Sequence, residues 1–129
     1  MKLISHISAL LLLFLILSLP VFAVSSIKPE SEKHFQQAVE AFETEDLSLA
    51  LKLFVKIYED NPRHLDTIIY LTRTYAQREQ LDEAKELIEL ALKLAPEHAQ
   101  VQNLSGRVYG VIARDASIFT ALGYAEDSL

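Results

Sequence analysis

The chain has 129 residues and a net charge of −6, with 18 acidic against 12 basic side chains. This length allows one small domain, and the acidic balance argues against general nucleic-acid binding, which needs clustered Lys and Arg. The absence of cysteine from the sequence excludes disulfides, thiolate metal ligands, thiol nucleophiles and a lipoprotein anchor.

Residues 1–23 have the three-part layout of a secretory signal peptide. Lys2 precedes an apolar run from about Ile7 to Leu19, and the sequence Val-Phe-Ala then ends at Ala23 in a small-x-small cleavage pattern. The run is shorter than the roughly 20 residues of a membrane-spanning helix. We therefore expect cleavage after Ala23, export to the periplasm or the medium, no stable membrane insertion afterwards and a net charge of −7. The alternative is a membrane-tethered protein that retains residues 1–23.

From Ser31 onward the chain is predicted to be helical, after a flexible lead-in over residues 24–30. No stretch alternates as a strand does, and proline falls only at the joints between helices. The stretch Leu65–Pro96 predicts two amphipathic helices joined by the polar turn Gln77–Gln80. Such a short hairpin cannot bury both of its faces alone, so neighbouring hairpins must cover it.

The sequence repeats with a period of 34 residues. Small residues recur where the two helices of a hairpin must cross closely, and large apolar residues recur where adjacent hairpins leave space. The aligned pairs include Pro62 with Pro96, His64 with His98, Tyr75 with Tyr109, Thr72 with Gly106, Ala50 with Ala84, Phe54 with Ile88, and Arg73 with Arg107.

This pattern resembles the tetratricopeptide repeat of exported bacterial proteins, whose signature is W-x2-L-G-x2-Y…A-x3-F…P. In the frame 65–98 the matching residues are Leu71, Tyr75, Ala84, Ala91 and Pro96. The frame 31–64 matches at Ala38, Ala50, Phe54 and Pro62, although polar residues occupy two of its usual apolar positions. The resemblance implies an all-α fold, in which antiparallel hairpins stack into a short solenoid behind the signal peptide.

Residues 99–129 form an incomplete or degenerate third repeat. Gly106 and Tyr109 fit the pattern and Asp115 is a candidate N-cap for a second helix, but Ile118 occupies the position of a small alanine. No closing proline or polar capping helix is recognisable. We therefore expect this open end either to pack on something, with self-association as one outcome, or to belong to a truncated, longer array.

No residues form a recognisable catalytic, cofactor or metal site. His64 and His98 are expected to be solvent-facing linker residues about one repeat apart, too far to share a metal. The carboxylates fall on faces opposite the apolar stripes. Phosphate loops, nucleophile elbows and zinc spacings are absent from the sequence. These observations favour a protein that is not an enzyme.

The resemblance implies a concave groove lined by the first helix of each repeat. Arg73 and Arg107 would stack there on an otherwise acidic protein, Asn103 would bond a peptide backbone, and Phe35 and Phe42 would offer an apolar end. The alternative is that each arginine only pairs with a neighbouring acid. The expected lining residues are Glu32, Phe35, Val39, Phe42, Asp66, Ile69, Arg73, Ala76, Gln100, Asn103, Arg107 and Gly110.

The groove is expected to take an extended or helical peptide with acidic and apolar features. The residues do not match the carboxylate clamp that binds a free C-terminus in chaperone-binding members of the family. The favoured hypothesis is an exported, non-catalytic adaptor or scaffold for assembling a complex in the cell envelope. The alternative is a fragment of a longer repeat protein whose enzymatic or ligand-binding part is missing.

Overall fold

The computed structural model describes residues 29–126, so the predicted signal peptide and residues 127–129 lie outside it. Five helices follow one another within this range: α2 (Pro29–Glu43), α3 (Leu47–Asp60), α4 (Leu65–Gln77), α5 (Leu81–Leu94) and α6 (Ala99–Glu126). Helix α2 already includes Pro29 and Glu30, two residues before the expected start at Ser31.

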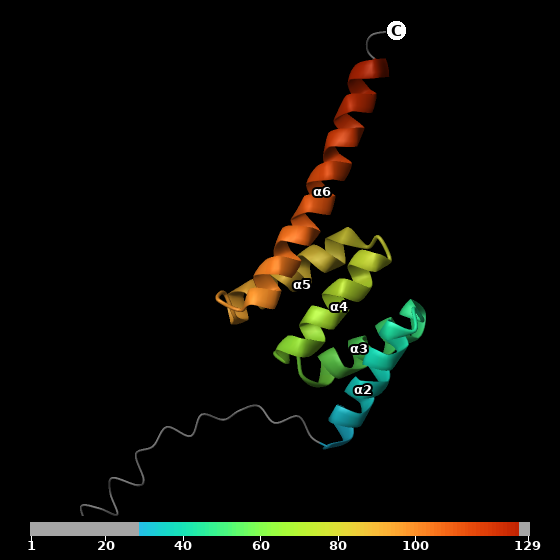
Figure 1. Cartoon of the computed structure of the whole chain (residues 1–129), viewed down its shortest axis with the longest axis vertical. Helices are drawn as coiled ribbons and strands as arrows, with labels where there is room; N and C mark the ends of the chain where they lie inside the picture. Colours follow the sequence, from blue (N-terminus) through green and yellow to red (C-terminus); the bar gives the residue numbers. More distant parts are fainter. Residues whose placement is uncertain (1–28, 127–129) are drawn as a thin grey trace, which may run out of the picture.

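The helices form antiparallel hairpins that stack on one another (Figure 1). α2 pairs with α3 and α4 pairs with α5, while α3 packs against α4 and α5 packs against α6. Each helix therefore covers its neighbours in the sequence, as expected for a repeat array whose units bury their apolar faces on one another. The predicted all-α stack of hairpins is confirmed.

The core lies between these hairpins. Ala38, Ala50 and Ala84 are fully buried, so the helices approach closely where the sequence predicts small residues. Phe54 and Ile88, the large apolar residues of the two second helices, are also fully buried. Three threonines are buried, and the hydroxyl group of each forms a hydrogen bond with a residue three or four positions earlier. Thr72, for example, donates to the Ile68 carbonyl at 2.7 Å.

The turns inside the first two hairpins have the same backbone geometry. Glu45 and Glu79 occupy equivalent positions and both adopt the left-handed conformation, with φ of 62° and 61°. Asp46 also caps α3, since its Oδ1 accepts a hydrogen bond from the Leu49 amide at 3.0 Å. Gln80, the corresponding residue before α5, makes no such side-chain cap.

The third hairpin does not form, and the expectation that Asp115 begins a second helix is wrong. Residues 99–126 are one continuous helix of 28 residues, with Asp115 in its interior. In the 34-residue register the turn would fall at Val111–Arg114, and Ala113 would have to adopt the left-handed conformation of Glu79. Two of these four residues are β-branched, and the left-handed conformation costs a non-glycine residue about 1–2 kcal/mol. The helix therefore continues through them.

The first half of α6 covers the stack, contrary to the expectation that no polar capping helix is present. Val101, Leu104 and Val108 are buried. Gln102 and Ser105 stand where the second repeat has the buried Ile68 and Leu71, so the opposite face of the helix is polar. Such a face can remain in solvent, as the terminal unit of a repeat array requires.

Gly106 illustrates the consequence of the missing hairpin. It was expected to let a second helix cross closely, as Ala38 and Thr72 do. Instead it is exposed, and a Cβ placed on it would meet nothing within 4 Å. In the described structure, therefore, the small size of Gly106 does not serve to let another helix pass close by.

The second half of α6 extends well beyond the other helices (Figure 1). Residues 116–120 are all exposed, and among them Ile118 and Phe119 keep 52% and 75% of their accessible surface. Within the described range, no helix combines the length and apolarity needed to cross a bilayer.

Candidate partner-binding groove

The first helices of successive repeats lie along one face of the stack. α2 contacts α4, and α4 contacts α6, although none of them is consecutive in the sequence. This arrangement places residues that are 34 apart on neighbouring helices, as the repeat predicts. Arg73 of α4 and Arg107 of α6 are such a pair.

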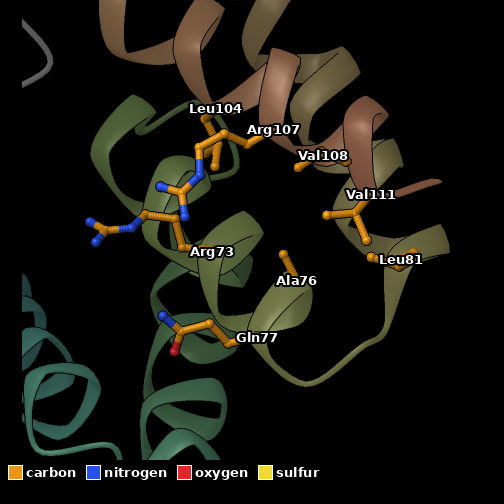
Figure 2. Close-up of a pocket in the computed structure, with 8 residues that line it drawn as sticks. All are labelled: Arg73, Ala76, Gln77, Leu81, Leu104, Arg107, Val108 and Val111. Atoms are coloured by element: carbon orange, nitrogen blue, oxygen red, sulfur yellow. The ribbon is translucent and has the colours of Figure 1, made fainter. Parts of the chain in front are cut away.

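A pocket of about 170 Å³ opens on this face where α4, α5 and α6 meet. In Figure 2 the two arginines extend on one side of it, and Ala76, Leu81 and Val111 lie on the other. The pocket thus presents positive charge beside an apolar wall. Its lining residues are Arg73, Ala76, Gln77, Leu81, Leu104, Arg107, Val108 and Val111.

Arg73 is held in place by two aromatic rings. Its guanidinium carbon lies 4.8 Å from the centroid of the Phe42 ring and 5.1 Å from that of Tyr70. Each such cation–π contact contributes about 0.5–1 kcal/mol at an exposed site. The side chain is therefore oriented before any ligand binds, although its charge is not neutralised by the rings.

Neither arginine of the pocket pairs with an acid among the residues that the structure describes. Among the side chains that the structure describes, the ion pairs are Lys85 with Glu89, and Arg114 with Asp115. The alternative in which Arg73 and Arg107 only neutralise neighbouring carboxylates is therefore not the arrangement observed. Both guanidinium groups can donate paired N–H bonds to an incoming carboxylate.

Three expected groove residues are part of the core instead. Phe35, Phe42 and Ile69 retain only 8%, 7% and 1% of their accessible surface. Phe35 and Phe42 therefore cannot offer the apolar end that was expected of them, and Ile69 does not line the groove surface. The reason is aromatic packing, because Phe35 and Phe42 both meet the edge or face of Tyr70, with ring centroids 5.8 and 5.6 Å apart. Phe42 contributes to the site by supporting Arg73 and not by direct exposure.

The other expected residues are accessible in different degrees. Glu32, Asp66, Gln100, Asn103 and Gly110 are exposed and Val39 is half-buried, but none of these six lines the pocket. Arg73, Ala76 and Arg107 do line it. The remaining lining residues, Gln77, Leu81, Leu104, Val108 and Val111, were not among the expected residues. Leu104 and Val108 carry a signal in the sequence, because they continue the apolar stripe of α6.

His64 is a structural residue and not the solvent-facing linker residue that was expected. Its side chain caps the N-terminus of α4, because its Nδ1 accepts a hydrogen bond from the Thr67 amide at 3.3 Å. The same nitrogen lies 2.7 Å from the Thr67 hydroxyl. Its ring also packs on the edge of Phe35, with centroids 5.5 Å apart. His98, one repeat later, is exposed as expected.

Tyr109 connects α6 to α5 through its side chain. Its hydroxyl donates a hydrogen bond to Glu89 Oε1 at 3.0 Å. Because this carboxylate accepts from the protonated phenol and repels the phenolate, it raises the pKa of Tyr109 above the usual 10.0. Burial, followed by the charge of Glu83, raises the pKa of the equivalent Tyr75.

The rest of the described surface offers few groups from which a catalytic, metal or ligand site could be built. No group of three or more His, Asp or Glu side chains is placed there to hold a metal ion. A second hollow of about 460 Å³ lies on α2 and α3, away from the arginines. Its lining includes the carboxylates Glu40 and Asp46, and Asp46 is already engaged as the cap of α3.

A family model of the tetratricopeptide repeat matches residues 41–108, just over half of the chain. The chain belongs to the tetratricopeptide repeat (TPR) family. The match runs from the end of the first TPR helix to Val108, the last buried residue of α6 in the core. TPR domains generally bind other proteins, and their fold is typically a non-catalytic scaffold.

A solved TPR structure has the same arrangement of helices. It is the solution NMR structure of a tetratricopeptide repeat domain protein from Salinibacter ruber, which is similar to this chain with a TM-score of 0.58 and 21% sequence identity. The likeness covers 67% of this chain and 95% of that one, and at this identity it concerns the fold. No curated protein matches the chain.

Proposed function

We propose that this TPR protein is an exported, non-catalytic adaptor that binds a partner protein in the cell envelope through the groove of α2, α4 and α6. The observation that carries the proposal is the position of Arg73 and Arg107, which share one pocket without a pairing acid among the described side chains. Export rests on the layout of residues 1–23, and a scaffolding role rests on the family.

The pocket favours a peptide segment in which an acidic residue lies next to an apolar one. The carboxylate would accept hydrogen bonds from the two guanidinium groups, which are stronger than neutral ones because both partners are charged. The apolar side chain would enter between Ala76, Leu81 and Val111. Charge also favours this choice, since the pocket is lined by two cations on a protein whose net charge is −6.

Selection of displayed random peptides on the purified chain tests the groove. We expect the selected peptides to combine Asp or Glu with a neighbouring Leu, Ile, Val or Phe. Arg73→Glu together with Arg107→Glu should weaken their binding at least tenfold, because two attractive contacts become repulsive. The matched control is Lys52→Glu with Lys56→Glu, the same change of charge on the exposed side of α3.

Two results would contradict the groove. One is the selection of peptides without an acidic residue. The other is equal affinity for the wild type and the Arg73→Glu, Arg107→Glu variant while circular dichroism shows both to be folded. Export has its own test, which is N-terminal sequencing of the protein purified from a cell fraction. A start at Val24 supports it, whereas retention of Met1 indicates the membrane-tethered form.

A further inference from the structure

One side of the pocket carries an amide group beyond the two cations. In Figure 2, Arg107, Arg73 and Gln77 follow one another along this side, opposite the apolar Leu81 and Val111. Gln77 is the last residue of α4 and lies one turn after Arg73, about 6 Å along the helix axis at 1.5 Å per residue. The pocket therefore offers, next to its positive charge, a neutral group that can both donate and accept a hydrogen bond.

The amide of Gln77 is not committed to the fold. It is exposed, and it makes no hydrogen bond within the part of the chain that the structure describes. Two other glutamines are engaged: Gln80 accepts from Arg78, and Gln102 donates to the Pro96 carbonyl. A ligand that covers Gln77 displaces its hydrogen bonds to solvent and must therefore bring a donor or an acceptor of its own.

The pocket has room for a single large side chain. Its volume of about 170 Å³ is close to the roughly 150 Å³ of a cavity that holds one benzene molecule. A helix that docks in a groove uses several anchors instead, at positions i, i+3, i+4 and i+7 of its apolar face. The groove cannot offer a row of contacts to such anchors through Phe35, Phe42 and Ile69, because these three residues are buried in the core.

An extended segment suits a pocket with one apolar site and one free amide. Its backbone N–H and C=O groups are available to side chains, whereas those of a helix bond one another except at its ends. We infer that the groove binds its partner as an extended segment: one carboxylate meets the two arginines, one apolar side chain fills the pocket, and Gln77 bonds the neighbouring backbone. This inference rests on the proposed function of the groove.

The spacing along α4 agrees with this mode of binding. An extended chain advances about 3.3 Å per residue, so a backbone group within two residues of the acidic one can reach Gln77 from the arginines. A helical segment with the same side chains would cover the amide of Gln77 without offering it a backbone partner, and it would bind more weakly for that reason. Gln77 is thus a residue that determines which conformation of the partner is selected.

A peptide selected on the purified full chain, synthesised with both ends blocked, is the probe for this inference. Gln77→Met keeps the length of the side chain and removes its hydrogen bonds. It should weaken the binding of the peptide about threefold to tenfold, the effect of one or two ordinary hydrogen bonds. The matched control Gln37→Met makes the same exchange at an exposed position of α2 outside this pocket and should leave the affinity unchanged. Fluorescence anisotropy measures both.

Two changes in the peptide test the backbone contact directly. An ester in place of a backbone amide removes the N–H and weakens the carbonyl as an acceptor. One such ester near the acidic residue should weaken binding to the wild type but have little effect on binding to Gln77→Met, because the partner of that group is already lost. A bridge that holds the peptide helical, placed away from its acidic and apolar residues, should weaken binding at least tenfold.

Three outcomes would overturn the inference. The wild type and Gln77→Met could bind the peptide equally well. Every ester could have the same effect on both proteins. The bridged, helical peptide could bind as tightly as the free one or more tightly. The arginines separate these results from the proposed function: if Arg73→Glu with Arg107→Glu still abolishes binding, the groove stands and only the extended mode of binding is wrong.

Discussion

Arg73 of the second repeat rests on Phe42 of the first, with its guanidinium carbon 4.8 Å from the ring centroid. A core aromatic residue of one hairpin thereby positions a cation in the groove of the next. The contact couples the packing of the first repeat to the binding surface. A change of Phe42 should therefore affect both stability and ligand binding.

Phe42→Leu is expected to lower the free energy of unfolding by about 1–2 kcal/mol, since it removes part of a buried side chain. It should also weaken the binding of an acidic, apolar peptide severalfold, because Arg73 loses one of its two aromatic supports. The control is Ile88→Val, a buried change in α5 that should cost about 1 kcal/mol and leave the peptide affinity unchanged. Chemical denaturation and fluorescence anisotropy measure the two effects; equal affinities would show that the aromatic support is irrelevant.

His64→Ala should destabilise the chain by about 1 kcal/mol, in the range measured for lost N-caps. The variant loses the Nδ1 acceptor of the Thr67 amide and the ring contact with Phe35. His98→Ala is the matched control, because this histidine occupies the equivalent position of the next repeat but is exposed. Urea unfolding should show a shifted midpoint for the first variant only. Equal midpoints would mean that the cap contributes nothing.

Glycine should have opposite effects at two equivalent positions. Glu79→Gly should stabilise the chain by about 0.5–1 kcal/mol, because glycine adopts a φ of 61° without the steric cost that glutamate bears. Ala113→Gly should destabilise α6 by about 1 kcal/mol, the usual cost of glycine inside a helix. Thermal unfolding followed by circular dichroism compares them. A stabilising Ala113→Gly would instead indicate that residues 111–114 form a turn.

The hydrogen bond between Tyr109 and Glu89 predicts a dependence on high pH. The folded state holds the pKa of Tyr109 above 10.0, so the stabilising contribution of this bond is complete below pH 10 and is lost as the pH rises further. Glu89→Gln should lower the pKa of Tyr109 toward its usual value, since the negative charge is removed. Ultraviolet titration of tyrosinate in both proteins measures the difference, and superimposable curves would contradict the bond.

Much of the stack could be predicted from the sequence. The period of 34 residues and the apolar spacing within each helix are local properties, and each hairpin packs mainly on its neighbours along the chain. Pro62 and Pro96 mark the joints for the same local reason. Arg73 and Arg107 were likewise placed on one face by the period alone.

The end of the stack was predicted less well, although a signal was present. Comparison of Val111–Arg114 with Gln77–Gln80 shows apolar and β-branched residues where the earlier turn is polar. The alignment of Gly106 and Tyr109 with the repeat favoured a third hairpin, but these residues describe a helix face and contain no information on where the helix ends. The continuity of α6 depends on the residues of the missing turn.

The sequence by itself therefore determined the all-α repeat architecture and the pairing of the two groove arginines, because periodic patterns specify which helix faces meet. Only the tertiary structure decided which aromatic residues are exposed and which are core. Phe35, Phe42 and Ile69 have groove positions in the repeat, yet all three are buried, and the rotation of α2 against α4 packs the two phenylalanines around Tyr70. The orientation of Arg73 and the wall of the pocket depend on that rotation, which arises from contacts among three helices and not from spacing along one of them.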